Sequence, residues 1–475
     1  MSVRSFAKLT TASLMIGCLI IPTVGRASDE RKPNILVIVS DDQGFADVGF
    51  NGCKDIPTPN LDALARGGVC FKNGYVSGPY CSPTRAGFLT GRYQQRFGHE
   101  FNPGGQKAEG IFGLPLSETT LANHLKAAGY ATGLVGKWHL GSDPIFQPQQ
   151  RGFDEFFGFL GGEHSYFDGR LARETEKPGS NPIYRGTEVV EEKQYLTDAF
   201  EREAISFIDR HQQHPFFLYL AFNAVHTPLH ATDERLKRFA GIEDPTRRTY
   251  AAMLSALDDS VGKVIEKLKA SGLEKDTLIV FFSDNGGPTM LGTTINGSRN
   301  EPFRGSKRTT LEGGVHVPFV IQWAGKLPAG TYEPPVIQLD VLPTVLAAAG
   351  IEANPDWKLD GVNLLPYLNG QVSGSPHQAL YWRLGEQAAI RRGDWKLVRY
   401  DKAVDEPGTL SNPQARDNAT SFRLYNLAHD PGESQDLAST NPTEFQALLD
   451  AWLAWDAQLA KPLWGPAAGI TASTP

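Results

Sequence analysis

Cys81 begins a segment in which a proline and an arginine follow at i+2 and i+4, as Pro83 and Arg85. The segment closes with Leu-Thr-Gly-Arg at residues 89–92. A short motif can match by chance, so one interpretation is a surface turn that holds a free thiol. An exposed thiol is an odd choice outside the cell, where it oxidises, and the length of the patterned run favours chemistry at residue 81.

Two pairs of oxygen-bearing side chains, Asp41-Asp42 and Asp284-Asn285, each come directly after an apolar run. A divalent cation such as Ca²⁺ prefers six or more oxygen ligands, many of them carboxylates, whereas zinc prefers histidine or thiolate. The two pairs therefore predict a calcium site completed by substrate oxygens. The alternative is that both are caps and turns at the ends of strands.

Four cationic or titratable residues, Lys137, His139, His226 and Lys307, could handle an anion and its protons. Lys137 and His139 are two residues apart in Gly-Lys-Trp-His-Leu-Gly, and in an extended segment they project to one face. The imidazole of His226 titrates near neutrality, which suits a general acid. Taken singly, each histidine could be structural, and Lys307 could be a solvated loop residue.

Together these motifs resemble those of the type I sulfatases, of the alkaline phosphatase superfamily, over nearly all of the chain from Pro33 onward. In that family a formylglycine-generating or sulfatase-maturating enzyme oxidises the cysteine of Cys-x-Pro-x-Arg to formylglycine, and the hydrated aldehyde attacks the sulfur of a sulfate ester. The resemblance implies that the modified Cys81 is the nucleophile. It also implies one Ca²⁺ per chain, held by Asp41, Asp42, Asp284, Asn285 and the modified Cys81.

The resemblance gives each remaining motif residue a role. Arg85 hydrogen-bonds the aldehyde hydrate, and Lys137 holds the sulfate. His139 takes a proton from the second hydroxyl, which expels sulfate, while His226 and Lys307 reach the leaving oxygen. A phosphonate or phosphate monoester hydrolase on the same fold is the principal alternative. A sulfotransferase-like or phosphotransfer role would require an acceptor site, and a non-enzymatic polysaccharide-binding module would be expected to lack part of the catalytic set.

The substrate expected from the resemblance is a sulfated carbohydrate, either an algal galactan, carrageenan, ulvan or fucan, or a glycosaminoglycan. Loops 99–112, 159–190 and 288–306 are expected to select it. The candidate contacts to a sugar or to a neighbouring anionic group are His164, Tyr166, Arg170, Arg299 and Arg304.

The elements that must position these residues follow from periodicity. Continuous apolar runs predict buried strands of a parallel sheet in an α/β fold at 34–40, 131–135, 216–222, 277–283 and 317–323. Ligands gather beyond the carboxyl ends of such strands. Helices are predicted at 59–66, 118–128 with Ser117 as cap, 195–212, 246–271 and 338–349. Residues 142–190 read as long loops.

A second, smaller α+β domain is predicted after a change of composition near residue 375. Its short strands at 379–383, 388–391, 396–400 and 422–427 indicate an antiparallel sheet, followed by a helix at 443–459. The predicted division is a signal peptide at 1–27, a catalytic domain at 28–375 and the small domain at 376–475.

Composition limits the location and partners. The 475 residues carry a net charge of −7, which disfavours nucleic acid and anionic membranes as general partners. Arg4 and Lys8, the largely apolar run at 9–24 and a cleavage region at 25–27 predict a cleaved signal peptide, and hence a periplasmic or secreted protein. A membrane anchor or a lipoprotein at Cys18 is the alternative, and no other run is long enough to span a bilayer. Cys53 and Cys70 could form a disulfide or remain two thiols.

Overall fold

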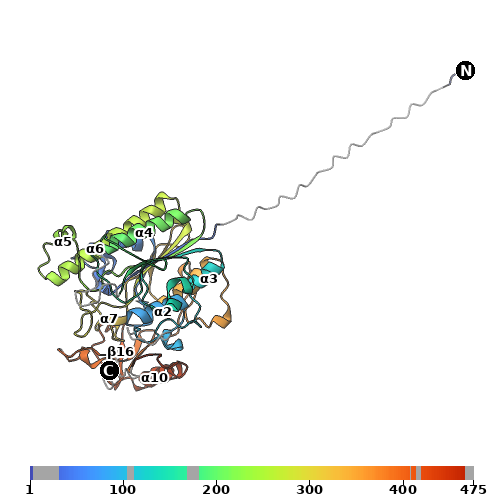
Figure 1. Ribbon diagram of the computed structural model, residues 1–475. Helices are drawn as coiled ribbons and strands as arrows, with labels where there is room; N and C mark the ends of the chain where they lie inside the picture. Colours follow the sequence, from blue (N-terminus) through green and yellow to red (C-terminus); the bar gives the residue numbers. More distant parts are fainter. Residues whose placement is uncertain (4–30, 104–111, 168–180, 407, 413–418, 466–475) are drawn as a thin grey trace. The chain divides into compact units, whose positions relative to one another are not determined.

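The computed structural model describes residues 1–3, 31–103, 112–167, 181–406, 408–412 and 419–465. Residues 4–27 of the predicted signal peptide, Cys18 among them, lie outside these ranges, and so does the candidate contact Arg170. Residues from Lys32 onward form one compact unit. Figure 1 shows this unit as a twisted sheet with helices on both sides.

The large sheet is mixed and mostly parallel. Its strands are β1 (Asn34–Ser40), β2 (Val69–Phe71), β4 (Ala131–Lys137), β5 (Glu155–Phe159), β6 (Ile183–Arg185), β7 (Glu188–Val190), β8 (Phe216–Ala221), β9 (Thr277–Ser283), β10 (Phe319–Trp323) and β11 (Gly330–Tyr332). The order is β11-β2-β10-β9-β1-β8-β4-β5-β6-β7. The central strands β9, β1, β8, β4 and β5 are parallel, whereas β10 runs antiparallel to β9. Both faces of this sheet are covered, which explains the continuous apolar runs.

Helices cover the two faces of the sheet. On one face lie α1 (Pro59–Gly67), α4 (Leu196–His211), α5 (Asp233–Arg238) and α6 (Pro245–Ala270), and on the other α2 (Cys81–Thr90), α3 (Leu121–Ala127), α8 (Val341–Ala348) and α9 (Leu365–Leu368). Alternate residues of β1 serve both cores: Leu36 and Ile38 pack toward α4 and α6, whereas Ile35 and Val37 pack toward α2 and α8. The predicted α/β architecture is confirmed.

The C-terminal residues form a separate, small antiparallel sheet. Its strands are β13 (Leu380–Leu384), β14 (Gln387–Arg392), β15 (Trp395–Arg399) and β16 (Arg423–Asn426), in that order, and α10 (Pro442–Asp456) packs against them. A two-stranded parallel pair, β3 (Gly74–Tyr75) with β12 (Val336–Ile337), and the short α7 (Glu312–Val315) complete the fold. The predicted antiparallel sheet with one helix is confirmed, and a domain boundary near residue 375 stays a prediction.

The helix predicted at 118–128 begins later than expected. Thr120, and not Ser117, is the N-cap of α3. The Thr120 hydroxyl accepts from the backbone N–H of Asn123 at 3.1 Å, and the Asn123 side chain accepts from the Thr120 N–H at 3.1 Å. This reciprocal pair satisfies two donors that would otherwise lack partners, so it fixes the start of the helix.

The prediction that residues 142–190 are all loops is wrong, because β5, β6 and β7 lie within them. The signal was weak because Gly158 interrupts the short aromatic strand β5. The glycine is required there: a Cβ at Gly158 would lie 1.9 Å from the carbonyl oxygen of Gly136 on β4.

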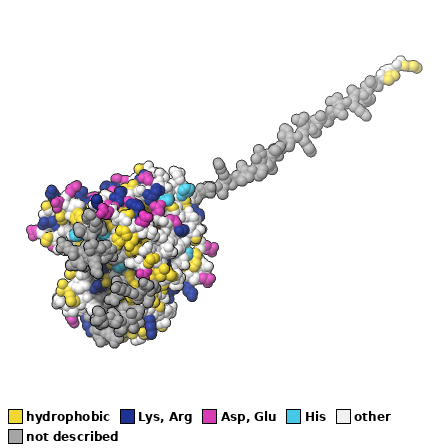
Figure 2. Space-filling model, viewed as in Figure 1, with side chains coloured by type: hydrophobic (Ala, Val, Ile, Leu, Met, Phe, Trp, Pro, Cys, Tyr) yellow, Lys and Arg dark blue, Asp and Glu magenta, His cyan; other side chains and the backbone are white. Residues whose placement is uncertain are grey.

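Other observations bear on location and cysteines. Among the helices that the structure describes, none is long and apolar enough to span a bilayer. Cys53 and Cys70 are both free thiols. On the face shown in Figure 2, acidic and basic side chains are interspersed over the region of α4 to α6.

Candidate active site

Four neighbouring parallel strands end at one edge of the sheet and bring the predicted site residues together. Ser40 of β1 and Ser283 of β9 are register partners, so the pairs Asp41-Asp42 and Asp284-Asn285 that follow them lie side by side. β4 ends at Lys137, and His226 follows β8 after a short turn. The first residue of α2, Cys81, lies over this edge, and its side chain is 1% exposed.

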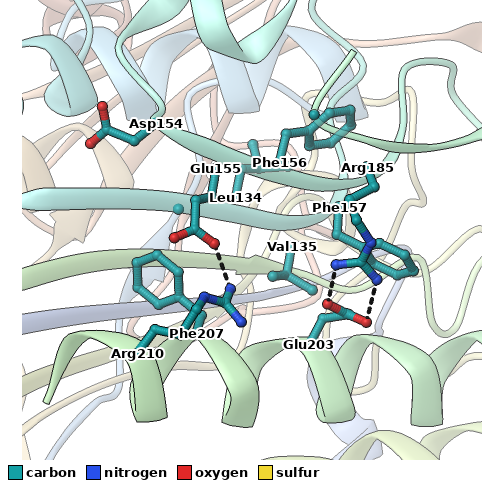
Figure 3. Close-up of a pocket in the computed structure, with 12 residues that line it drawn as sticks. Leu134, Val135, Asp154, Glu155, Phe156, Phe157, Arg185, Glu203, Phe207 and Arg210 are labelled. Atoms are coloured by element: carbon teal, nitrogen blue, oxygen red, sulfur yellow. Dashed lines mark hydrogen bonds and ion pairs between the residues drawn. The ribbon is translucent and has the colours of Figure 1, made fainter. Parts of the chain in front are cut away.

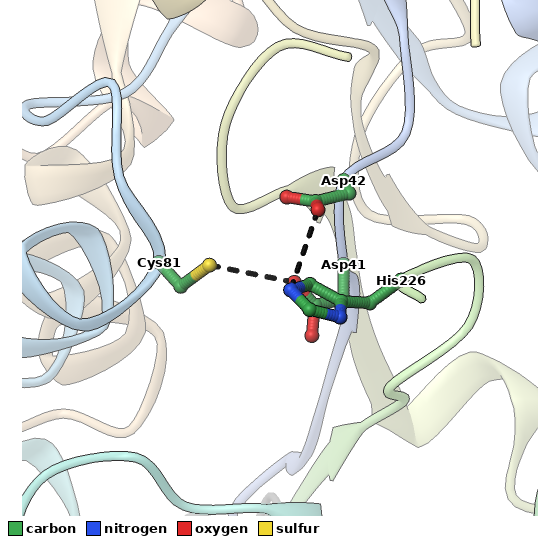
Figure 4. A group of neighbouring side chains, drawn as sticks. All are labelled: Asp41, Asp42, Cys81 and His226. Carbon is green, nitrogen blue, oxygen red and sulfur yellow. Dashed lines mark hydrogen bonds and ion pairs between the residues drawn. The ribbon is translucent and has the colours of Figure 1, made fainter. Parts of the chain in front are cut away.

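Asp41, Asp42, Cys81 and His226 form a compact cluster, drawn in Figure 4. Ligand atoms of these four residues all lie within 4.8 Å of one another. Cys81 Sγ is 3.6 Å from Asp41 Oδ1, and His226 Nε2 is 3.5 Å from Asp42 Oδ2. Residues far apart in sequence therefore form one buried cluster.

Two lysines hold the paired aspartates. Lys137 Nζ donates to Asp41 Oδ2 at 2.5 Å, and Lys307 Nζ lies 2.7 Å from Asp42 Oδ1. All four side chains are buried, at 2% exposure or less. Although burial opposes it, the charge of Lys307 lowers the pKa of Asp42 below its ordinary value, so Asp42 is a carboxylate at neutral pH.

Arg85 is directed at Asp284. Its Nε and Nη2 donate to Asp284 Oδ2 at 3.0 and 2.8 Å, and Nη2 lies 3.8 Å from Asp41 Oδ2. Burial and the nearby charge of Asp41 nevertheless raise the pKa of Asp284 to about 6. Arg85 lies on α2, four residues after Cys81, and pairs from there with the carboxylates of the site.

The donor set fits a hard divalent cation. Three carboxylates and the Asn285 amide meet at this edge, and the Asn285 amide nitrogen donates to Asp42 Oδ1 at 2.8 Å. Its oxygen, Oδ1, is buried and finds no hydrogen-bond donor among the described residues. A buried oxygen left in this way beside carboxylates is suited to Ca²⁺, which takes six or more oxygens.

The thiol of Cys81 is a poor nucleophile as it stands. Burial raises its pKa to about 12, although the charges of Lys137 and Lys307 oppose the shift. Only thiolates attack or ligate efficiently, and almost none is present at neutral pH with such a pKa.

His226 is held in a defined orientation, and both histidines have lowered pKa values. His226 Nδ1 donates to the Thr227 carbonyl at 2.6 Å, which leaves Nε2 facing Asp42. Burial lowers the pKa of His226 to about 4, against the influence of Asp42. Burial, together with the charges of Lys137 and Arg85, lowers the pKa of His139 well below its ordinary value, so His139 is a neutral base.

Further contacts that the sequence did not single out position His139. Its backbone lies in the left-handed region, at φ 57°, where non-glycine residues are uncommon outside functional sites. The Ser82 hydroxyl donates to the His139 carbonyl at 2.6 Å. A Cβ at Gly162 would lie 2.8 Å from the His139 ring, so a glycine is needed beside the imidazole.

The candidate substrate contacts are dispersed. Tyr166 is 1% exposed, with its hydroxyl 2.5 Å from the Asn223 carbonyl and 2.9 Å from the His226 carbonyl. His164 is also buried. Arg299 pairs with Asp55, and Arg304 donates to Tyr400 and Asp405 of the C-terminal region. The structure thus gives Tyr166, Arg299 and Arg304 partners within the protein, and Arg170 lies outside the described residues.

Asp42 has two polar neighbours that sequence reasoning missed. The Thr294 hydroxyl donates to Asp42 Oδ2 at 2.8 Å, and Asn296 Nδ2 donates to the carbonyl oxygens of Asp42 and Val225 at 3.1 and 2.9 Å. Both residues come from the loop 288–306, whose path has no periodicity to read. Only the polarity of that loop hinted at them.

Apart from this site, a cavity of about 300 Å³ lies between β4, β5 and α4 and is drawn in Figure 3. Ion pairs between Arg185 and Glu203, and between Arg210 and Glu155, border it. Its lining includes none of the site residues described above. We assign it no function.

The fold and the strand-end site define a hydrolase of the alkaline phosphatase superfamily. Within that superfamily the chain belongs to the sulfatase family, which its residues 33–351 match. It is accordingly a sulfuric ester hydrolase.

Relatives and solved structures agree with this assignment. The N-acetylgalactosamine-6-sulfatase of Mus musculus is 36% identical over 458 residues, which cover 89% of this chain and 85% of the relative. The arylsulfatase A of Homo sapiens is 34% identical, covering 88% of this chain and 86% of its own. The crystal structure of Ps i-CgsB has a TM-score of 0.82 at 37% identity, covering 92% of this chain and 95% of that one. The same protein in complex with k-i-k-neocarrahexaose gives 0.81. A phosphonate monoester hydrolase of Agrobacterium radiobacter, at 20% identity and a TM-score of 0.62, shows the fold alone.

Proposed function

We propose that this enzyme hydrolyses sulfate esters of a sulfated carbohydrate, with formylglycine formed from Cys81 as its nucleophile. The observation that carries the proposal is the position of Cys81: it is buried against Asp41, in one cluster with Asp42 and His226, and its thiol has a pKa raised to about 12. A neutral thiol contributes little there, whereas a hydrated aldehyde offers two hydroxyls. The Cys-x-Pro-x-Arg segment supports oxidation by a formylglycine-generating enzyme.

Asp41, Asp42, Asp284 and Asn285 are the residues that would hold Ca²⁺. Such a cation supplies positive charge that offsets the negative oxygens of a sulfate ester. Lys137 and Lys307, whose ammonium groups lie at Asp41 and Asp42, provide further positive charge for the ester and for the charge that grows on its leaving oxygen.

The two histidines divide the proton transfers. A hydrated aldehyde at residue 81 would supply the attacking hydroxyl, and the Asp41 carboxylate beside residue 81 would take its proton. His226 Nε2 would give a proton to the sugar oxygen as the bond of that oxygen to sulfur breaks. The bound anionic ester adds negative charge beside His226, which raises its pKa and allows Nε2 to carry that proton. His139, a neutral base, would take the proton of the second hydroxyl as sulfate departs, and water would rehydrate the aldehyde.

A galactan of the carrageenan type is the proposed substrate class, supported by the neighbour solved with a neocarrahexaose. Glycosaminoglycan sulfate is the other class, since a curated relative acts on N-acetylgalactosamine 6-sulfate by its name. The export proposed from residues 1–27 places the enzyme in the periplasm or outside the cell, where such polymers are met.

Peptide mass spectrometry across residue 81, combined with sulfate release from carrageenan and chondroitin oligosaccharides, tests the proposal. We expect formylglycine at residue 81 in protein from the native host, with release from the preferred oligosaccharide and none by the Cys81→Ala variant. Full activity of protein whose Cys81 is unmodified would overturn the mechanism. Modified protein that cleaves a nitrophenyl phosphate faster than the corresponding sulfate would favour a phosphate or phosphonate ester instead.

A further inference from the structure

Two half-buried residues, Tyr80 and Arg308, are the sequence neighbours of two fully buried members of the site, Cys81 and Lys307. The Lys307 ammonium lies 5.7 Å from the centre of the Tyr80 ring, and the Arg308 guanidinium carbon lies 5.1 Å from the same centre. Arg308 Nη2 also donates to the Tyr80 hydroxyl at 2.9 Å. One tyrosine ring thus links a cation inside the site with a second cation that is partly open to solvent.

The backbone of Arg308 has an uncommon conformation, and its side chain lies against the Tyr80 ring. Its φ of 74° lies in the left-handed region, which side chains other than glycine rarely adopt. The Arg308 N–H donates to the Pro79 carbonyl at 2.7 Å, and Gln387 Nε2 donates to the Arg308 carbonyl at 2.7 Å. In an extended segment adjacent side chains point to opposite sides, whereas here both Lys307 and Arg308 reach the Tyr80 ring. Such conformations are concentrated at functional sites.

Arg308 also differs from Arg299 and Arg304 in having no carboxylate partner among the described residues. Arg299 pairs with Asp55 and Arg304 with Asp405, whereas the hydrogen-bond partners of Arg308 are the neutral Gly292 carbonyl, at 2.6 Å, and Tyr80. No carboxylate of the described residues lies within ion-pair distance of Arg308. A guanidinium presents five donors in a planar fork that matches sulfate and carboxylate oxygens.

The loop that Arg308 contacts extends from the surface to the buried residues of the site. Gly292 is exposed, and so are Leu291 and Ile295 beside it, at 47% and 42%. In the same loop, the Thr294 hydroxyl donates to Asp42 Oδ2 and lies 3.2 Å from Lys307 Nζ. The loop therefore runs from the buried carboxylates to Arg308.

We propose that Arg308, set against Tyr80, binds a second anionic group on the carbohydrate whose ester is cleaved beside residue 81. The group is a sulfate or a carboxylate, held by the guanidinium fork while the Tyr80 ring fixes the fork in place. The proposal rests on the proposed function and deepens it, because it makes the enzyme select a polyanionic chain over a singly sulfated one.

Three oligosaccharides that share one cleavable ester, with a sulfate, a carboxylate or neither on the adjoining sugar, test the subsite. The variants are Arg308→Gln and Arg308→Gly, the second because glycine adopts the left-handed conformation without strain. We expect KM for the preferred charged substrate to rise about tenfold, the loss typical of one charge-assisted hydrogen bond, and the KM for the neutral one to rise much less. The charged oligosaccharide whose KM rises more shows whether the bound group is sulfate or carboxylate. Arg66→Gln, which removes an exposed arginine from α1, is the matched control and should show no such selectivity.

Equal losses on all three substrates, or none, would overturn the proposal and leave Arg308 a structural residue. Calorimetric binding of the same oligosaccharides to the Cys81→Ala variant, with and without Arg308→Gln, reads the subsite without turnover. If the wild type releases no sulfate, the proposed function fails. The tenfold loss of affinity on Arg308→Gln in that binding experiment still supports the subsite, and its absence still refutes it.

Discussion

The Asn285 side chain donates its amide N–H to Asp42 at 2.8 Å, and this bond leaves the amide oxygen buried among carboxylates without a donor of its own among the described residues. Asn285→Ala should weaken Ca²⁺ binding about 10- to 100-fold, as loss of one oxygen ligand or its orienting partner does. The measurement is the rise in melting temperature with added Ca²⁺ after chelation, with activity followed in parallel. Asn285→Asp, which keeps an oxygen there, is the control. Equal Ca²⁺ affinities in wild type and Asn285→Ala would contradict the assigned site.

Gly162→Ala should disable His139 without unfolding the protein. The added methyl group would lie 2.8 Å from the imidazole, which has to move, so we expect kcat to fall about tenfold or more, as loss of a positioned acid–base group does. Steady-state kinetics and the melting temperature are measured together. Gly241→Ala, whose methyl group would meet nothing within 4 Å, is the matched control. A fall in melting temperature with unchanged kcat would show that the glycine serves packing alone.

Tyr166→Phe separates two roles for a residue first considered as a sugar contact. The Tyr166 hydroxyl is buried against the carbonyl oxygens of Asn223 and His226, so its loss should displace His226 and cost about 1–2 kcal/mol of stability. We expect kcat to fall several-fold with KM nearly unchanged. The check is saturation kinetics on an oligosaccharide, with chemical denaturation for stability. A rise in KM at constant kcat would show instead that Tyr166 contacts the substrate.

His377 should give the protein a pH-dependent stability. Burial disfavours its charge, but Asp340, 2.8 Å from Nε2, outweighs burial and raises the pKa of His377 above its ordinary value. The stabilisation is therefore complete below the pKa of an unfolded histidine and is lost as pH rises through the raised value. His377→Gln should be less stable than wild type by about 1–3 kcal/mol at mildly acidic pH, as for a buried charge-assisted bond, and the gap should narrow in alkali. Urea unfolding of both proteins across that range tests this, and a gap independent of pH would refute it.

The sequence predicted the central strands because burial on both faces leaves continuous apolar runs, as in Asn34–Ser40 and Thr277–Ser283. It also predicted that Asp41 and Asp284 converge, since the carboxyl ends of parallel strands share one edge of the sheet. The short β5 was missed because Gly158 weakens its pattern, yet that glycine is what lets β5 approach β4.

Loop residues were less accessible to prediction, because their partners depend on long-range folding. Arg304 was considered for substrate from its place in a basic loop, but it donates to the carbonyl of Glu433, 129 residues away. Arg308 carries no motif, and its left-handed backbone is visible only in three dimensions. Thr294 and Asn296 likewise gain their meaning only once the loop has reached Asp42.

Because Cys81 is buried, any enzymatic modification of its side chain has to precede the folding of this region. The residue opens a helix whose ten members are all buried, and almost none of its sulfur can be reached from solvent. An enzyme that alters this side chain must meet it while the polypeptide is still open. If formylglycine at residue 81 is the nucleophile, the supply of active protein is decided during biosynthesis, and a chain that folds before the modification is inactive.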